Sequence, residues 1–356
     1  MKLTLHQICL SFPHHGNCVM QISLSDQELW TLQRDLQVSR QAAFAPGTLK
    51  NLKCQWKSFL VFCMYFGLQY LPTSLSTVSL YAQYLQNYFK SVDSVRNYIH
   101  GVKILHFYVG CDFPWMQTFE FRSMLKGFAR LKPHRRRRAA AITPGILMKL
   151  HDVMDLEDPV YMAAWSAFLI AFFSDGQKIK CCPTQLGLPK FSSVKHLTRC
   201  NISITDSGLL VSLFWSKTNQ FGSRVLQVPL PTIPNSLLCP TSAFERLVAK
   251  VPGSPDLPAF AYVVRPKLLI LTKYKFVKSL EHFLELAGLN PMSFKGHSCR
   301  RGGASFAFQA GVPGELIKLH GDWASSAYLS YLDFSLDSRW AVGCKMRDLI
   351  LQLPTF

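Results

Sequence analysis

The stretch FKGHSCRRGGASFAFQAGVPGELIKLHGDWASSAYLSYLDFSLDSR, residues 294–339, carries the strongest pattern in the chain. Near its start, His297 and Arg300 are three residues apart, so on a helix both side chains would share one face and could bind one anion. Gly311 followed by Pro313 is typical of one helix ending and another beginning. The stretch therefore predicts a compact helical unit that presents a His/Arg pair.

Beyond the break, a short helix is predicted to end at Gly321, and Asp322 and Trp323 follow it. A third helix is predicted to carry Tyr328 and Tyr331, and their spacing would again put both on one face. Taken singly, these features are weak, because an exposed helix can carry a His and an Arg by chance and paired tyrosines more often serve packing. Their order along the chain makes the pattern specific.

The composition points to a nucleic-acid partner. The chain has 356 residues, enough for two domains, and 49% hydrophobic residues exclude a disordered chain. Lys and Arg number 39 against 21 Asp and Glu, a net charge of +18, so the expected partner is a polyanion, nucleic acid before membrane. The longest apolar run, residues 161–173, is too short to span a bilayer. We therefore expect no membrane association.

The eleven cysteines show no CxxC pair and no His/Cys cluster at zinc spacing, so no metal site is expected. Without a disulfide framework or a secretory signal, they predict reduced thiols inside the cell.

The first part of the chain predicts helices and basic surface. Residues 1–45 are expected to form an N-terminal arm, and residues 46–132 a bundle of four helices without strand signals. Residues 133–142 form a basic linker with four consecutive arginines, which are expected to contact DNA phosphates. The four are Arg135, Arg136, Arg137 and Arg138. The run also fits a nuclear import signal, so a nuclear location is expected.

Residues 143–356 predict a second domain of the α+β class. Helices are expected at residues 144–154, 158–174, 240–250 and 274–287. Between the second and third of these, alternating apolar runs around Asp206-Ser207-Gly208 and Asn219-Gln220-Phe221-Gly222 predict a small antiparallel sheet of about three strands.

The ordered pattern His-x-x-Arg, Gly-Gly, helix break, Gly-Asp-Trp and a tyrosine ten residues after Gly321 resembles the C-terminal half of the tyrosine recombinase (phage integrase) family. It is most similar in wording to recombinases encoded by eukaryotic mobile elements of the DIRS and Crypton kinds. The resemblance implies an all-helical, SAM-like core-binding domain followed by a mostly helical catalytic domain with a small sheet, the DNA breaking-rejoining fold. It also implies double-stranded DNA as partner, a homo-oligomer on DNA, and no cofactor.

The implied reaction is the attack of a tyrosine hydroxyl on a DNA phosphodiester, which gives a 3′-phosphotyrosine and a free 5′-hydroxyl. The family's roles fall on Tyr331 as nucleophile, Arg300 as the second arginine and His297 as general acid/base or phosphate ligand. Lys217, at the tip of the predicted hairpin, would protonate the leaving oxygen, and Trp323 or Asp322 stands where the family has His or Trp. The spacing alone leaves Tyr328 open as the nucleophile. The DNA-binding residues implied besides the arginine run are Lys178 and Arg301.

The chain departs from the family at the first arginine. That position, after the apolar helix, falls on Gln177, with Lys178 beside it. Glutamine carries no charge and lysine lacks the guanidinium fork. Loss of one preorganised transition-state donor typically costs about 10²–10³-fold in rate. The hypotheses are therefore a recombinase of mobile-element origin, active or impaired, and a domesticated, non-catalytic DNA-binding scaffold. The agreement of three ordered motifs argues against an unrelated basic interaction protein.

Overall fold

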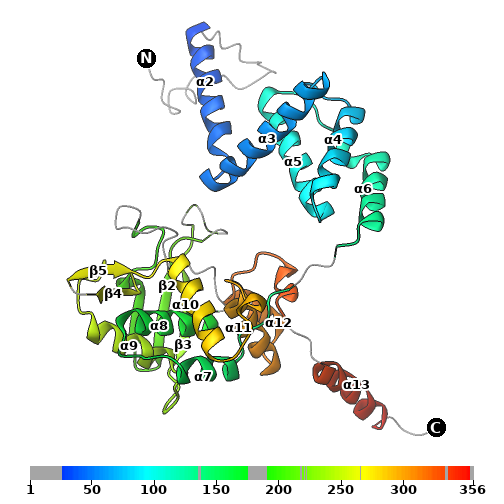
Figure 1. The fold of residues 1–356 in the computed structure, drawn as a ribbon. Coiled ribbons are helices and arrows are strands. Elements are labelled where there is room, and N and C mark those ends of the chain that lie inside the picture. Colours follow the sequence, from blue (N-terminus) through cyan, green and yellow to red (C-terminus); the bar gives the residue numbers. More distant parts are fainter. Residues whose placement is uncertain are drawn as a thin grey trace, which may run out of the picture. The chain divides into compact units, whose positions relative to one another are not determined.

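The computed structural model describes residues 26–134, 138–174, 191–216, 219, 221, 223–264, 266–332 and 336–352. The chain folds into two compact units, Met1–Arg136 and Arg137–Phe356. Figure 1 labels their helices and strands. None of the helices in the described ranges is long and apolar enough to cross a membrane.

The described part of the first unit is helical. Its α-helices are α2 (Asp26–Ala42), α3 (Pro46–Phe66), α4 (Leu75–Tyr88), α5 (Val92–Val109) and α6 (Phe119–Leu131). Local signals set their ends: Gly67 and Gly110 close α3 and α5 in the left-handed region, with φ of 63° and 75°. The Ser74 side chain accepts a hydrogen bond from the amide of Thr77 at the start of α4. Helices α3 to α6 agree with the four helices predicted for residues 46–132, and α2 lies in the segment predicted as an N-terminal arm.

The core of the first unit is aromatic and lies between α3, α4, α5 and α6. Phe59, Tyr81, Ile99 and Phe121 are fully buried in it. Gly101 brings α5 against α3 so closely that a Cβ there would lie 2.2 Å from the Gln55 side-chain oxygen.

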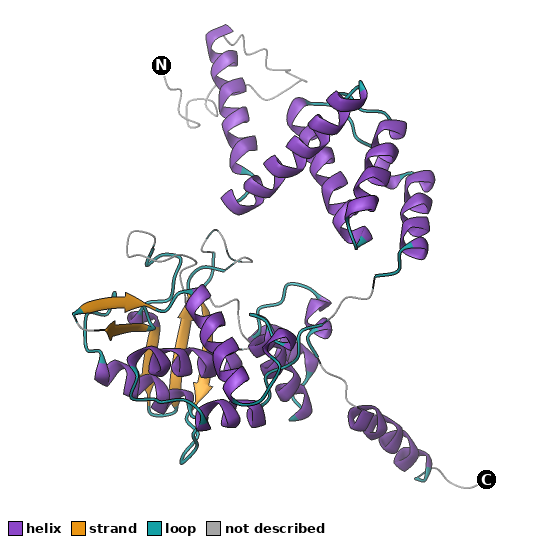
Figure 2. Ribbon diagram, in the orientation of Figure 1, coloured by secondary structure: helices purple, strands orange, loops and turns teal. Residues whose placement is uncertain are grey.

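The second unit is organised around one apolar helix. Thr143 caps α7 (Pro144–Asp152), and Asp158 caps α8 (Pro159–Phe173). Every residue of α8 from Met162 to Phe172 is buried, so the helix is covered on all sides. Figures 1 and 2 show it running across the unit beside the strands.

An antiparallel sheet contributes residues to one side of the candidate site. Its strands β1 (Ile202–Thr205), β2 (Gly208–Leu213) and β3 (Leu226–Pro231) pair in the order β1-β2-β3, which confirms the predicted three strands. A second hairpin, β4 (Ala261–Val264) with β5 (Lys267–Ile270), was not predicted. Both of its strands are short apolar runs without alternation, a pattern that does not separate strand from helix.

Further α-helices follow in the described residues of the second unit. They are α9 (Pro240–Lys250), α10 (Lys273–Leu286), α11 (Ser298–Gln309), α12 (Gly314–His320) and α13 (Leu336–Ile350). Short 3₁₀ helices lie at Arg199–Asn201, Pro291–Ser293 and Ser326–Ser330. The mixture of helices with small antiparallel sheets confirms the α+β prediction.

The end of the linker is fastened to the start of α11. The amides of Ala140 and Ile142 donate to the carbonyls of Ser293 and Ser298, at 2.7 and 3.1 Å. Gly302 lies against the Ile142 carbonyl, because a Cβ on Gly302 would be 1.8 Å from that oxygen. The segment that follows the arginine run is therefore held in register with the His-x-x-Arg helix.

Candidate active site

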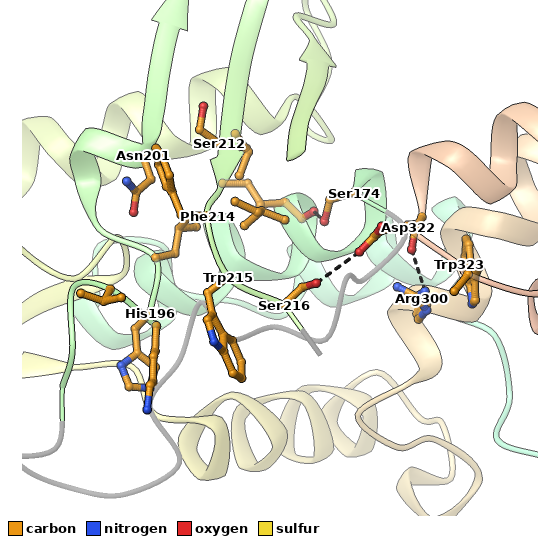
Figure 3. Close-up of a pocket in the computed structure, with 18 of the residues that line it drawn as sticks. Ser174, His196, Asn201, Ser212, Phe214, Trp215, Ser216, Arg300, Asp322 and Trp323 are labelled. Atoms are coloured by element: carbon orange, nitrogen blue, oxygen red, sulfur yellow. Dashed lines mark hydrogen bonds between the residues drawn. The ribbon is translucent and has the colours of Figure 1, made fainter. Parts of the chain in front are cut away.

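A cavity of about 400 Å³ lies in the second unit where the His-x-x-Arg helix meets the three-stranded sheet. Figure 3 shows that Ser174 at the end of α8, the residues after β2, Arg300 and the turn after α12 all face it. Residues between Arg300 and Tyr331 and the residues that follow β2 are thus brought to one place.

Arg300 is the buried cation of this cavity. It lies in the first turn of α11 and is 8% exposed. Its guanidinium carbon is 3.7 Å from the centre of the Trp323 ring, and Nη2 donates to the Gly321 carbonyl at 2.8 Å. A guanidinium stacked on an aromatic face and hydrogen-bonded has one defined orientation, which suits it to bind a planar or tetrahedral anion.

The spacing predicted that His297 and Arg300 would share one helix face, and this prediction was wrong. His297 precedes the first helical residue as the N-cap of α11 and is exposed. Its ring nevertheless lies 6.2 Å from the ring of Tyr331, and the guanidinium of Arg300 lies 5.5 Å from that same ring. The pair therefore converges on one tyrosine by a different local geometry.

The two candidate tyrosines have different surroundings. Tyr328 is 8% exposed and packs with Ile317, and its hydroxyl occupies the space that a Cβ on Gly314 would take, at 2.8 Å. Tyr331, directly after the Ser326–Ser330 3₁₀ helix, is partly exposed and lines the cavity. Only Tyr331 of the two lines the cavity beside Arg300.

The turn after α12 supplies the aromatic wall. A Cβ on Gly321 would lie 1.6 Å from the Trp323 indole, so only glycine leaves room for this ring. His320, one residue earlier, is 2.8 Å through Nε2 from the Phe173 carbonyl at the end of α8. The turn is therefore joined both to Arg300 and to the helix that precedes the predicted first-arginine position.

Asp322 joins this turn to the hairpin. Its side chain is 7% exposed, forms an ion pair with Arg224, and accepts a hydrogen bond from Ser216 Oγ at 3.2 Å. Arg224 and Asp322 are 98 residues apart. Sequence reasoning placed Asp322 near the site but missed Arg224 and Ser216, because no local pattern signals a pair so far apart in the chain.

A buried cysteine thiol lies next to Arg300 in the sequence. Burial raises the pKa of the Cys299 thiol, next to Arg300, to about 12. This thiol is therefore protonated at neutral pH. Among the residues that the structure describes, no three or more His, Cys, Asp and Glu side chains form a group that could hold a metal ion.

Comparison with known proteins gives this geometry a context. No protein-family model matches the chain. The sequence is 23% identical to an integrase/recombinase XerD homologue of Selenomonas ruminantium over 269 residues, which cover 74% of each chain. The fold is similar to that of the Tn1549 transposon integrase solved with circular intermediate DNA: the TM-score is 0.57 at 12% identity, over 88% of this chain and 97% of that one. A variant of that integrase solved with transposon right end DNA has the same TM-score at 13% identity, over 88% and 98%.

The chain has the tyrosine recombinase fold. The similarity in sequence to an integrase/recombinase homologue and the similarity in fold to a transposon integrase both agree with the resemblance seen in the sequence. The finer likeness to recombinases of DIRS and Crypton elements stays a prediction.

Several positions that the tyrosine recombinase resemblance implies lie outside the described residues. They are Gln177, Lys178, Lys217, Arg135, Arg136 and Arg137. Their neighbours Ser174 and Ser216 line the cavity. Arg138 is exposed.

Arg301 has a contact that its expected role on DNA did not include. It is half-buried and donates through Nη1 to the Ala139 carbonyl at 3.0 Å. In the described geometry it holds the end of the linker against α11.

Proposed function

We propose that this chain is a DNA-binding tyrosine recombinase homologue of mobile-element origin that works through a 3′-phosphotyrosine intermediate. We propose further that Gln177 at the first arginine position impairs its catalysis. The observation that carries the proposal is the placement of Tyr331 beside Arg300 and Trp323 at the cavity wall, with the His297 ring 6.2 Å from the Tyr331 ring. The superfamily supported by sequence and fold uses the same types of group.

The reaction proceeds by direct displacement at phosphorus. The Tyr331 hydroxyl gives its proton to a general base, for which His297 is the candidate, and attacks the scissile phosphate. The bond to the 5′-oxygen breaks, and that oxygen is protonated as it leaves. The phosphotyrosine keeps the phosphodiester in activated form, so a second 5′-hydroxyl can reverse the step without an external energy source. Lys217 is the proposed donor of the proton to the leaving oxygen, and His297 assists proton transfer or binds the phosphate.

Arg300 stabilises the transition state in this proposal. Negative charge grows on the non-bridging phosphate oxygens, and a guanidinium can donate two parallel hydrogen bonds to them. Because Arg300 is already stacked on Trp323 and bonded to Gly321, little reorientation is required when the phosphate arrives.

Tyr331 is a better nucleophile candidate than Tyr328 for a steric reason. The Tyr328 hydroxyl is packed against Gly314 in a buried cluster, so a phosphate would have to displace that packing. Tyr331 borders the open cavity and lies near the cation that would receive the phosphate.

The basic surfaces supply the proposed DNA contacts. On α3, Lys50, Lys53 and Lys57 are exposed at intervals of three and four residues and form one positive stripe. Together with the arginine run and a net charge of +18, they favour binding to duplex DNA by phosphate neutralisation. A homo-oligomer on DNA and a nuclear location belong to the same proposal.

Gln177 also favours a second candidate function, that of a domesticated DNA-binding scaffold without catalysis. The two candidates share the DNA-binding surfaces and differ in whether a covalent adduct forms. A trapping assay therefore separates them.

The test uses a pool of nicked duplexes of randomised sequence, in which cleavage releases a short strand and leaves the protein covalently attached. The unaltered chain is expected to bind the pool with a steep dependence on salt and to give little adduct. Gln177→Arg should raise adduct formation by about two orders of magnitude. In that background Tyr331→Phe should abolish the adduct, whereas the matched control Tyr328→Phe should keep it.

Three results would contradict parts of the proposal. Absence of DNA binding at low salt would remove the recombinase function altogether. Efficient cleavage by the unaltered chain would show that another cation replaces the first arginine. An adduct that persists in Tyr331→Phe but not in Tyr328→Phe would move the nucleophile to Tyr328.

A further inference from the structure

The β2–β3 hairpin contacts the turn after α12 through its neck, by which we mean the residues that directly follow β2 and directly precede β3. Ser216 follows the end of β2, and Arg224 precedes β3, so they belong to the two arms of one hairpin. Both contact the carboxylate of Asp322: Ser216 through its hydroxyl, at 3.2 Å from Oδ2, and Arg224 through an ion pair with Oδ1. Figure 3 shows Ser216 bonded to Asp322 near Arg300. One carboxylate therefore holds both arms.

Within the hairpin, Asn219 keeps the two arms together. It is 5% exposed, and its amide nitrogen Nδ2 donates to the carbonyls of Phe214 and Arg224, at 3.1 and 2.5 Å. Its backbone amide also donates to Ser216 Oγ at 3.0 Å. The residues of the neck are thus joined to one another by hydrogen bonds, so contacts at Ser216 and Arg224 fix the position of the whole neck.

Asp322 occupies a backbone conformation that favours glycine. Its φ is +48°, and it is one of two non-glycine residues with positive φ in the described chain. The amide of Asp322 donates to the Leu319 carbonyl at 3.1 Å, and the amide of Trp323 donates to the Lys318 carbonyl at 3.0 Å. This pair of hydrogen bonds is a common helix ending, and its left-handed residue is usually glycine. A side chain kept at such a position indicates a role for that side chain.

We infer that Asp322 is a positioning residue that holds the β2–β3 hairpin beside Arg300, with Arg224 as its charge partner. The inference rests on the proposed function, because it gives the hairpin a part in the reaction. Gly321 receives the Arg300 guanidinium and Asp322, the next residue, receives the hairpin, so one short turn aligns both. Lys217, the proposed proton donor, follows Ser216 directly in the sequence.

The charge of the pair supports this arrangement. An uncompensated carboxylate beside a phosphate site would repel the substrate, and Arg224 removes that repulsion while it fastens the second arm. An ion pair that served general stability alone would not need to lie in a strained turn at the cavity wall.

The test compares Asp322→Gly with Asp322→Asn in the full chain that carries Gln177→Arg. Glycine suits the positive φ, so Asp322→Gly removes the carboxylate without backbone strain and should leave the melting temperature nearly unchanged. Hydrogen exchange of peptides that span residues 212–224 should become about tenfold faster. The adduct rate should fall about tenfold or more at unchanged affinity for DNA. Asp322→Asn keeps an acceptor for Ser216 but loses the charge for Arg224, so its exchange and adduct rates should fall between those of the other two chains.

Two outcomes count against the inference. Unchanged exchange in Asp322→Gly would show that the carboxylate does not hold the hairpin. Faster exchange with an unchanged adduct rate would show a structural tie without a part in the reaction. If the parent chain binds DNA but forms no adduct, the proposed catalysis fails by itself, and the exchange measurement still decides whether Asp322 holds the hairpin.

Discussion

Replacement of Gly302 by alanine tests whether the linker is held in register with the His-x-x-Arg helix. The added Cβ would lie 1.8 Å from the Ile142 carbonyl oxygen, whereas an ordinary contact begins at 3.4 Å, so that oxygen must retreat by about 1.6 Å. The shift would break the 3.1 Å hydrogen bond from the Ile142 amide to Ser298, which costs about 1 kcal/mol. Overpacking adds about 1–3 kcal/mol, and the better helix propensity of alanine returns about 1 kcal/mol.

The net expectation is a loss of about 1–3 kcal/mol in the free energy of unfolding of the second unit. For a unit of this size, that corresponds to a fall in melting temperature of roughly 3–10 °C. Differential scanning calorimetry of the full chain measures it. Gly145→Ala is the matched control in the same unit, since its Cβ would meet only the Thr143 hydroxyl at 3.9 Å, and it should not lower the melting temperature. If Gly302→Ala melts like the control or higher, the linker does not lie where described.

Two further predictions concern buried titratable groups. Burial lowers the pKa of His106 below its ordinary value of 6.5, and its Nε2 accepts the Thr73 amide, so the folded chain keeps the ring neutral while the unfolded chain takes up the proton. The neutral ring therefore stabilises the folded chain fully above pH 6.5, and this stabilisation is lost as the pH falls. The urea concentration at which half of the buried Cys63 becomes open to labelling should decrease from pH 7.5 to pH 5.5. A His106→Gln chain that shows the same decrease would contradict this explanation. The second prediction concerns Cys299, whose pKa burial raises to about 12. At pH 8, iodoacetamide should label the exposed Cys54 in the folded chain, but it should label Cys299 only after unfolding. Rapid labelling of Cys299 in the folded chain would show that α11 opens.

The sequence predicted the helices best where local chemistry sets their ends. Gly67 and Gly110 provide the left-handed residue that terminates a helix, and Ser74 offers an acceptor to the first free amides. Thr143 and Pro144 start α7 by the same logic. Such signals act within four residues, so they can be read without knowledge of the rest of the fold.

The ties across the site could not be predicted in this way. The contact of Arg224 with Asp322 depends on how the β2–β3 hairpin packs against the turn after α12, which no short window contains. The contact between Gly302 and Ile142 is equally non-local, although the double glycine was part of the pattern that identified the family resemblance. Sequence spacing therefore indicated which elements form the site but not the side chains that align them.

The two tyrosines illustrate what decides a role when spacing does not. Tyr328 and Tyr331 both approach Trp323, with ring centres 6.2 and 5.7 Å away. The helix that was predicted to carry both is instead a short 3₁₀ helix that ends at Ser330, before Tyr331, so the prediction of one helix was wrong. What separates them is glycine: Gly314 leaves room for the Tyr328 hydroxyl to be buried, and Gly321 leaves room for Trp323 to stack on Arg300 and border Tyr331. A larger residue at position 314 would push Tyr328 out of its packing and remove the difference between the two hydroxyls. The proposed choice of Tyr331 as nucleophile therefore depends as much on where the chain has no side chain as on where it has a tyrosine.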